Sequence, residues 1–306
     1  MMTTIQICEV SPRDGLQNEK TLLTTDEKIE LVTRSIAAGI KRIEVTSFVH
    51  PLKVPQMADA EAVMAGVPRV AGVKYAGLVM NQRGLDRALA AGVDEVDIVV
   101  VATDTFATKN QGVTSQESIR IASELVAAAR AANVASTITV GAAFGCPFEG
   151  EVSLDRITAI ISEVVAAGPD EIALADTIGV AVPSDVTQRV AIMKSLAPAT
   201  MPLRLHLHDT RHTGVANAVA AITAGISVLD SSIGGAGGCP FAPKATGNVA
   251  TEDLIYLFNR MRVSTGIDLD LIIEAAIWLE ERLGKVLPGA LSRAGDFPGE
   301  LLGASA

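Results

Sequence analysis

The sequence predicts a (β/α)8 barrel, the TIM barrel of the α/β class, with a C-terminal helical extension. Eight strand-like segments alternate with helical segments along the chain. Several strands are almost continuously apolar, as in Val96-Asp-Ile-Val-Val-Val101, which is typical of parallel strands buried on both faces. Helical segments repeatedly end in small residues before the next strand, as at Ala37-Ala-Gly39. An open doubly wound sheet is the alternative, but no Gly-x-Gly-x-x-Gly turn follows the first strand.

Each strand is expected where apolar or alternating residues run between turn residues. The helices between them begin at recognisable signals, since Thr24-x-x-Glu27 and Thr114-x-x-Glu117 have the capping-box spacing. A last helix is expected near Leu269–Gly284. We therefore expect one catalytic barrel over residues 1–285 and a C-terminal tail over 286–306. The strand segments are Ile5–Val10, Arg42–Phe48, Lys74–Val79, Glu95–Ala102, Thr137–Phe144, Glu171–Ala175, Leu203–His208 and Val228–Ile233.

The amino-acid composition argues against two classes of binding partner, nucleic acids and membranes. The 306 residues carry a formal net charge of −10 and only 3% aromatic residues, which argues against nucleic-acid or anionic-membrane binding. No secretory signal and no apolar run long enough to span a bilayer is apparent. The three cysteines are widely spaced and suggest no disulfide framework. We expect a cytoplasmic protein without a membrane or nucleic-acid partner.

Two of the four histidines, His206 and His208, stand two residues apart in a segment of alternating polarity. In a strand, residues i and i+2 project from the same face, so both imidazoles point to one side. This spacing predicts a metal site, the alternative being a structural pair of hydrogen-bonded histidines.

Other polar residues lie in or just after the strands, toward the end of a TIM barrel where active sites lie. They are Arg13, Asp14, Glu44, Asp176 and Asn248. Any one of them alone could cap the next helix, but several charges at one end need mutual compensation, which a divalent ion supplies. A mixed nitrogen and oxygen ligand set suits Mg²⁺, Mn²⁺, Zn²⁺ or Co²⁺. Arg13 either pairs with Asp14 or stabilises an enolate oxygen.

A glycine-rich segment precedes the third cysteine, with four glycines among residues 234–238. It lacks the Lys-Ser/Thr helix opening of a phosphate-binding loop, so we expect a mobile lid that carries Cys239. Cys8 lies within a strand and is assigned to the core, whereas Cys146 is ambiguous.

Taken together, these motifs resemble the 3-hydroxy-3-methylglutaryl-CoA lyase family, whose members belong to a superfamily of metal-dependent lyases and Claisen-type synthases on TIM barrels. The resemblance runs from the first strand to the last predicted helix. The matching motifs are Glu9-Val-Ser-Pro-Arg-Asp-Gly-Leu-Gln-Asn-Glu-Lys20, Ile43-Glu-Val-Thr-Ser-Phe48, Val54-Pro-Gln-Met57, Phe144-Gly-Cys-Pro147, Asp176-Thr-Ile-Gly179, His206-Leu-His-Asp-Thr210, Gly237-Gly-Cys-Pro240 and Ala245-Thr-Gly-Asn-Val-Ala-Thr-Glu-Asp253.

The resemblance implies roles for these residues. A Mg²⁺ or Mn²⁺ ion is expected on Asp14, His206, His208 and Asn248. Arg13 is expected to steady the enolate of the departing acetyl-CoA, and Cys239 to be needed for efficient turnover. Glu44 and Asp176 match acidic residues of the active site, with Asp176 interacting with the substrate hydroxyl or with His206, which is also expected to take part in catalysis.

The implied activity is cleavage of 3-hydroxy-3-methylglutaryl-CoA to acetyl-CoA and acetoacetate by a homo-oligomer, a dimer or larger. A related thioester such as citramalyl-CoA is the alternative substrate. A Claisen-type synthase is a further alternative, disfavoured because the short C-terminal region leaves no room for a regulatory domain. A barrel that binds metal and a CoA ligand without turnover is the last.

One segment departs from the family pattern. After Thr210 the lyases continue Tyr-Gly-Gln, whereas this chain continues Arg211-His-Thr-Gly214. Either Arg211 or His212 contacts a substrate carboxylate or a CoA phosphate, or the segment is a solvated loop variant.

Overall fold

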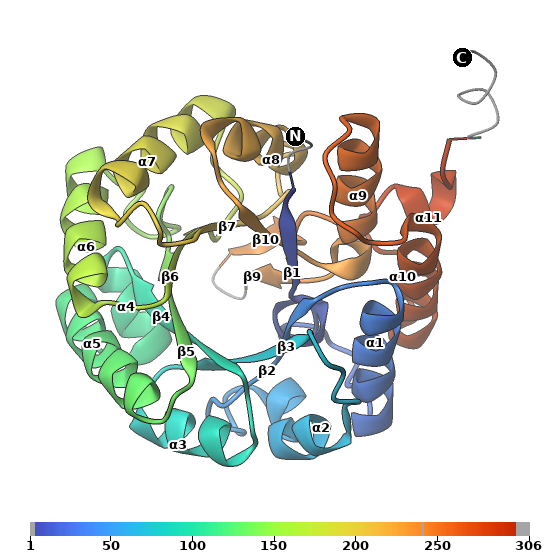
Figure 1. The fold of residues 1–306 in the computed structure, drawn as a ribbon, viewed down its shortest axis with the longest axis horizontal. Helices are drawn as coiled ribbons and strands as arrows, with labels where there is room; N and C mark the ends of the chain where they lie inside the picture. The colour runs from blue at the N-terminus through green and yellow to red at the C-terminus, as the bar shows by residue number, and fades with distance from the viewer. Residues whose placement is uncertain (1–3, 240–241, 298–306) are drawn as a thin grey trace.

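A closed barrel of eight parallel strands forms the centre of the molecule (Figure 1). The computed structural model describes residues 4–239 and 242–297, and for Cys239 and residues 242–246 it describes the backbone alone. Each strand pairs with the next in sequence, and β8 closes the ring on β1. The predicted fold is confirmed. The strands are β1 Gln6–Glu9, β2 Arg42–Ser47, β3 Lys74–Val79, β4 Glu95–Val101, β5 Ala135–Gly141, β6 Glu171–Asp176, β7 Leu203–Leu207 and β8 Val228–Ser231.

All eight predicted strands are present, but the fifth ends at Gly141 instead of Phe144. Ala142 has a positive φ of 55°, outside the strand region. Its N–H donates to the hydroxyl of Thr177 at 2.8 Å instead of to a neighbouring strand. The apolar residues that follow are buried, which is why the segment reads as strand from sequence.

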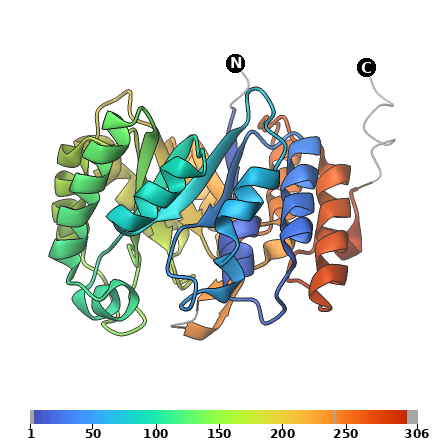
Figure 2. The same ribbon diagram turned by 90° about the horizontal axis from the view of Figure 1, so that it is seen from below.

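Helices form a ring around the barrel and bury their apolar faces against the strands (Figures 1 and 2). In α1, for example, Leu31 and Val32 are fully buried, whereas the opposite face is charged. Within the described residues, no helix is long and apolar enough to cross a membrane. The helices are α1 Thr25–Ala37, α2 Ala60–Gly66, α3 Gln82–Ala90, α4 Asp104–Gln111, α5 Ser115–Ala131, α6 Leu154–Ala167, α7 Pro183–Leu196, α8 Gly214–Ala224, α9 Thr251–Arg260, α10 Leu269–Leu283 and α11 Leu291–Ala294.

The two predicted capping boxes differ. At α1 the box is complete, because Thr24 Oγ1 accepts from the Glu27 N–H and the Glu27 carboxylate accepts from the Thr24 N–H. At α5 the Thr114 hydroxyl accepts from the Glu117 N–H at 3.2 Å, but the Glu117 carboxylate faces Arg120 at 2.7 Å. The helix start is therefore right and the second box is wrong, since an ion pair one turn away competes for the carboxylate.

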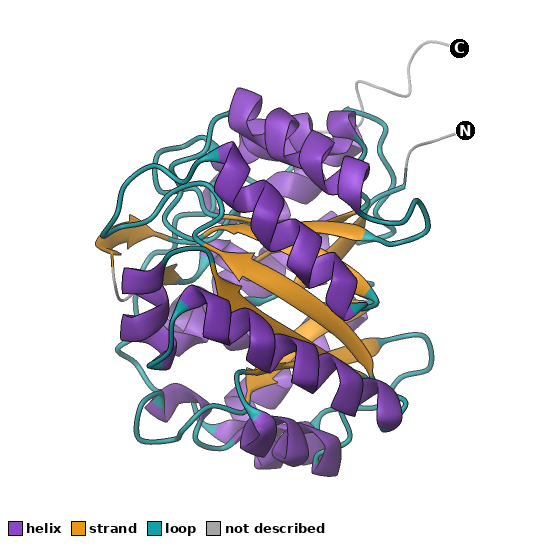
Figure 3. Ribbon diagram, turned by 90° about the vertical axis from the view of Figure 1, so that its left-hand side faces the viewer, coloured by secondary structure: helices purple, strands orange, loops and turns teal. Residues whose placement is uncertain are grey.

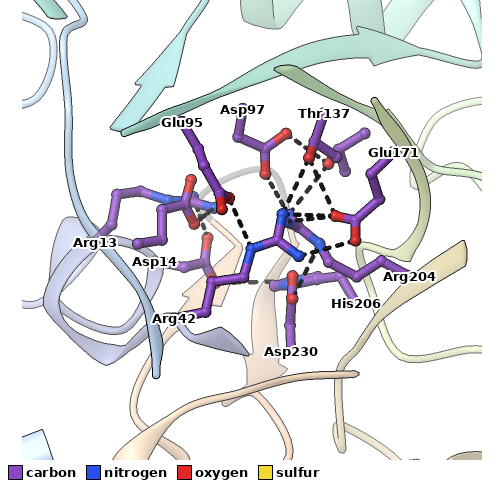
Figure 4. A network of polar contacts seen from close by, with 12 residues as sticks. Arg13, Asp14, Arg42, Glu95, Asp97, Thr137, Glu171, Arg204, His206 and Asp230 are labelled. Carbon is purple, nitrogen blue, oxygen red and sulfur yellow. Dashed lines mark hydrogen bonds and ion pairs between the residues drawn. The ribbon is translucent and has the colours of Figure 1, made fainter. Parts of the chain in front are cut away.

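The inside of the barrel is charged, whereas bulky apolar residues usually fill a TIM barrel (Figure 4). Arg42 from β2 contacts Glu95 at 2.7 Å and Glu171 at 2.8 Å. Arg204 from β7 contacts Asp97 and lies 3.1 Å from Asp230. Buried charges are tolerated only when paired, and here each guanidinium has at least two carboxylate partners.

The C-terminal part of the described chain packs beside the barrel. The expected helical extension is α10, which lies next to α1 (Figure 1). Beyond it, Leu287 is buried, and the Gly289 N–H donates to the carbonyl of Gly234 at 2.9 Å. The Asp253 carboxylate accepts from the Ala290 N–H at 3.0 Å. These contacts hold the described part of the tail against the segment that follows β8.

A two-stranded antiparallel hairpin, β9 Gly238–Cys239 with β10 Ala242–Thr246, forms a separate sheet that is not part of the barrel. It projects at the end toward which the barrel strands point (Figures 2 and 3). This is the end at which TIM barrels carry their functional residues.

Candidate metal and active site

Asp14 and Arg13 lie on a short π-helical turn, Ser11–Gly15, directly after β1. The buried carboxylate of Glu9 anchors this turn, because it accepts from the Ser11 N–H at 2.8 Å and from the Ile233 N–H at 3.0 Å. The turn packs so closely that a Cβ on Gly15 would lie 2.8 Å from Ser232 Oγ. Strand β1 and the segment after β8 thus fix Asp14 at the barrel mouth.

His206, on β7, and His208, directly after that strand, both face Asp14, as their spacing predicts. Their Nε2 atoms are 3.0 Å apart and lie 3.9 Å and 3.8 Å from Asp14 Oδ2. All three side chains are buried, and one donor atom from each falls within 4.8 Å of the others. This is a possible metal-binding triad.

Asn248, the fourth predicted ligand, pairs with His208 through an isolated bridge. Its Nδ2 donates to Asp14 Oδ2 at 2.8 Å and to the Ala236 carbonyl at 3.0 Å. Its Oδ1 is buried and has no hydrogen-bond partner among the described residues. Gly237, with φ +124°, permits this approach because a Cβ there would lie 2.5 Å from Asn248 Nδ2. An unpartnered amide oxygen beside a carboxylate and two imidazoles fits a cation.

The protonation states of Asp14 and His208 favour a metal site. Burial alone would lower the pKa of His206, but its hydrogen bond with Asp230 and the charge of Asp14 raise that pKa above its usual value. Burial and the neighbouring His206 lower the pKa of His208 to about 4, so this imidazole is neutral. Burial would raise the pKa of Asp14, yet Arg13 and the histidines hold it well below its usual range. A carboxylate and a neutral imidazole are the forms that bind metal.

Arg13 lies between two carboxylates. Its Nη1 donates to Asp14 Oδ1 at 2.6 Å, and its Nη2 lies 2.6 Å from Glu44 Oε2. Glu44, on β2, is 1% exposed. Burial raises the pKa of Glu44 to about 7, although Arg13 opposes the shift. Arg13 is thus held rigidly at the site and has its full charge.

Asp176 ends β6 and is fully buried. One carboxylate oxygen accepts from the Val180 N–H at 2.9 Å and the other from the Ala181 N–H at 3.0 Å. Both oxygens of Asp176 thus accept hydrogen bonds from the backbone of the loop before α7. The predicted catalytic role of Asp176 stays a prediction.

One cavity of roughly 730 Å³ opens at the site, but Glu44, Asp176 and Asn248 are not among the residues that line it. Its inner lining includes Asp97, Thr139, Arg204 and Asp230, from β4, β5, β7 and β8. Arg13, Asp14, His206 and His208 line it as well.

The outer lining of this cavity differs in character. Leu78, Met80 and Val101 supply apolar surface, and the exposed side chains of Lys53 and Lys109 supply positive charge. Such a cavity is apolar in part, has convergent polar groups at one end and carries cations at its open side.

The glycine-rich segment folds as a turn, Ile233–Gly235, followed by β9. Gly238 lines the cavity, and its carbonyl accepts from Asn18 Nδ2 at 2.7 Å. The Cys239 side chain lies outside the described part of the chain, so its role stays a prediction.

The other two cysteines have structural surroundings. Cys8 is fully buried in β1. The Cys146 sulfur accepts from the Thr103 hydroxyl at 3.1 Å and from the Phe148 N–H at 3.4 Å.

The segment that departs from the family pattern does not line the cavity. Arg211 Nη1 donates to the carbonyls of Ile178 and Gly179, at 3.0 Å and 2.8 Å. His212 is 94% exposed and lies 3.7 Å from Asp209. Arg211 therefore joins the loop after β7 to the loop after β6.

Sequence reasoning missed Asp230, whose Oδ2 lies 3.1 Å from His206 Nδ1, and its partner Arg204. A usable signal was present, since each is a charged residue inside a strand expected to be buried. Such a residue must meet an opposite charge inside the barrel.

A family model described as HMGL-like matches residues 4–278. The chain belongs to the HMGL-like family. The predicted family resemblance is thereby confirmed, over nearly the whole barrel.

Known members resemble this HMGL-like chain over most of their length. It is 43% identical over 304 residues to the (R)-citramalyl-CoA lyase of Chloroflexus aurantiacus, covering 96% of each chain. It is 40% identical over 284 residues to a hydroxymethylglutaryl-CoA lyase of Bacillus subtilis, covering 93% of this chain and 95% of the relative.

A solved structure of a lyase is similar to this chain over nearly its whole length. An HMG-CoA lyase from Acinetobacter baumannii, in complex with coenzyme A and 3-methylmalate, superposes with a TM-score of 0.92 at 38% identity. The match covers 96% of this HMGL-like chain and 95% of that one.

Proposed function

We propose that the protein is a divalent-metal-dependent carbon–carbon lyase that cleaves 3-hydroxy-3-methylglutaryl-CoA to acetyl-CoA and acetoacetate. One observation carries the proposal: Arg13, Asp14, His206 and His208 line one cavity at the strand ends. Relatives at about 40% identity named as hydroxymethylglutaryl-CoA lyases support it.

The chemistry defines what the site must do. The bond between C2 and C3 of the acyl chain breaks while the C3 hydroxyl loses its proton. The electron pair of that bond stays on C2 and forms a thioester enolate, and C3 becomes a ketone carbon. Protonation of C2 then completes acetyl-CoA. The site must accept one proton, stabilise one enolate oxygen and return one proton.

We infer that Asp14, His206, His208 and Asn248 hold Mg²⁺ or Mn²⁺. When bound, such an ion would supply a Lewis acid that lowers the pKa of a substrate hydroxyl. The buried, unpartnered Asn248 Oδ1 and the mixed set of nitrogen and oxygen donors support this assignment.

Arg13 is proposed to stabilise the enolate oxygen. A guanidinium held by Asp14 and Glu44 needs little reorganisation when negative charge develops beside it. Removing one such donor typically costs about 10²–10³-fold in kcat.

The proton acceptor is proposed among the acidic and imidazole groups at the mouth. Glu44, with a pKa of about 7, has the value suited to proton transfer near neutral pH. His206 is the imidazole candidate, and Asp176 acts through the loop that carries Thr177, a cavity-lining residue. We infer that Cys239 returns the proton to C2.

The open side of the cavity supports an acyl-CoA substrate. Coenzyme A carries several phosphate charges, and the chain as a whole is acidic with a net charge of −10. Lys53 and Lys109 therefore stand out as exposed cations along the cavity, where the phosphates of a bound thioester would find opposite charge.

Citramalyl-CoA is the second candidate substrate, favoured by the 43% identical (R)-citramalyl-CoA lyase. Cleavage of the corresponding bond again releases acetyl-CoA. In citramalyl-CoA the distal carboxylate is bonded directly to the carbinol carbon, whereas in 3-hydroxy-3-methylglutaryl-CoA a methylene separates them.

The test is incubation of the purified protein with Mg²⁺ or Mn²⁺ and a panel of 3-hydroxy-acyl-CoA thioesters, with products identified by mass spectrometry. The proposal predicts acetyl-CoA and acetoacetate from 3-hydroxy-3-methylglutaryl-CoA, lost in excess chelator and in Arg13→Met. The matched control is Arg83→Met, at an exposed arginine that does not line the cavity. Condensation of acetyl-CoA with a keto acid, without cleavage, would contradict it.

We also infer a cytoplasmic homo-oligomer. The free, buried thiols of Cys8 and Cys146 suit a reducing compartment. The homo-oligomer is inferred from membership of the HMGL-like family. Light scattering of the purified protein measures the mass, and a monomer would contradict the second inference.

A further inference from the structure

His206 and Asp230 face one another across neighbouring strands. The two residues are paired in the register of β7 and β8, and His206 Nδ1 lies 3.1 Å from Asp230 Oδ2 (Figure 4). Both side chains are buried, which limits competition from solvent for this contact. The opposite ring nitrogen, Nε2, is the atom that points toward Asp14 and His208.

The carboxylate of Asp230 is itself held in place. Its second oxygen lies 3.1 Å from Arg204 Nε, and Asp230 is 3% exposed. Arg204 in turn contacts Asp97 and lies 3.4 Å from Glu171 (Figure 4). The guanidinium thus gives the buried Asp230 carboxylate an adjacent counter-charge, which stabilises its ionised form.

This arrangement determines which nitrogen of His206 carries the hydrogen. An ionised carboxylate only accepts hydrogen bonds, so Nδ1 must be the donor toward Asp230. In the neutral ring the lone pair is then on Nε2, facing the triad. His208 has no such partner, because its buried Nδ1 lacks a hydrogen bond among the described residues. The two imidazoles of the site are therefore not equivalent.

We propose that Asp230 is a positioning residue that fixes the tautomer and ring orientation of His206 for metal binding, with Arg204 as its counter-charge. The inference rests on the metal site of the proposed function and extends it to a residue outside the ligand set. Loss of such a partner typically weakens metal affinity about 10–100-fold.

The first test examines the unmodified protein and uses one variant only to assign signals. In ¹⁵N-histidine-labelled, metal-free protein, only four histidines give signals, and an H206N sample identifies the His206 pair. We expect the His206 hydrogen on Nδ1. A hydrogen found on Nε2 alone would overturn the proposal, whether or not Asp230→Asn folds.

The second test compares Mn²⁺ affinity by titration calorimetry in Asp230→Asn and Glu171→Gln. Both remove a buried charge that faces Arg204, but only Asp230 touches His206. We expect Mn²⁺ to bind roughly 10–100-fold more weakly to Asp230→Asn and little changed to Glu171→Gln.

The possible outcomes distinguish the metal site itself from the positioning role of Asp230. Wild-type affinity in Asp230→Asn, or equal losses in both variants, would overturn the positioning role while leaving the metal site standing. A wild-type protein that binds no Mn²⁺ would overturn the metal site and this role together. If Asp230→Asn also moves the His206 hydrogen to Nε2, the positioning role is supported separately from any general loss of stability.

Discussion

Arg13 Nη2 lies 2.6 Å from Glu44 Oε2 inside the barrel mouth, and both side chains are largely shielded from solvent. This ion pair contributes both to the stability of the fold and to the proposed catalytic role of Arg13. Arg13 stabilises the charge of Glu44, and Glu44 holds the guanidinium beside Asp14. A change at either residue should therefore affect folding and turnover in separable ways.

Arg13→Met should lower kcat by about 10²–10³-fold, because the enolate loses its cation. It should also lower the free energy of unfolding by roughly 3 kcal/mol, because Glu44 is left without its partner. The double variant R13M/E44Q should regain stability but not activity. Urea unfolding and steady-state kinetics measure the two effects, and kcat within about tenfold of wild type in Arg13→Met would contradict the role.

Glu252 predicts a pH dependence of stability. It is fully buried on α9, and burial raises its pKa to about 8 although Gly234 N–H donates to it. In the unfolded chain the carboxyl ionises near its usual value, so between about pH 4.5 and 8 the unfolded state binds fewer protons than the folded state. The contribution of Glu252 to the free energy of unfolding therefore falls as the pH rises through that window and is constant above it.

Glu252→Gln should remove that contribution. The unfolding free energy of the variant should fall less steeply than that of wild type between pH 5 and 8, by up to about 1.4 kcal/mol per pH unit. Denaturation midpoints at several pH values measure the difference. Parallel curves for the two proteins would show that Glu252 does not titrate across this range.

Because the barrel interior is charged, removing a buried arginine should lower the stability of the protein more than removing an exposed one. Arg42→Met should lower the free energy of unfolding by roughly 3–5 kcal/mol, since Glu95 and Glu171 lose a buried partner. The matched surface variant is Arg120→Met, where an exposed arginine pairs with Glu117. Its unfolding midpoint should change little, because water screens that pair. Similar losses in both would contradict the distinction.

The contacts of Arg211 predict an effect on rate without an effect on substrate choice. Because it binds the carbonyls of Ile178 and Gly179 and does not line the cavity, Arg211→Tyr should lower kcat/KM alike for all thioesters cleaved. The exposed His212→Ala serves as the control and should behave as wild type. A changed ratio between 3-hydroxy-3-methylglutaryl-CoA and citramalyl-CoA in Arg211→Tyr would place Arg211 at the substrate.

The fold was predictable because local patterns determine most of a TIM barrel. Apolar runs ending in turn residues locate all eight strands, and Gly or Asn stops locate the helix ends. The predicted end of β5 was wrong because of a tertiary contact, in which the Ala142 N–H donates to the hydroxyl of Thr177. No local pattern in the sequence indicates a hydrogen-bond partner just beyond the next strand.

The site was predictable only in part, for the same reason. The i, i+2 spacing of His206 and His208 places them on one face, and the order of the strands brings Asp14 beside them. The pairing of Asp230 with His206 depends on the register between β7 and β8, which strand patterns leave open. The use of Asp176 oxygens by the loop backbone likewise depends on loop conformation.

The central claim is that a divalent metal binds among Asp14, His206, His208 and Asn248. Anomalous diffraction from crystals grown with Mn²⁺ tests it most directly. We expect one strong peak within bonding distance of all four side chains, absent in His206→Ala crystals. A structure with no peak at this position, or with the peak at another cluster, would contradict the account.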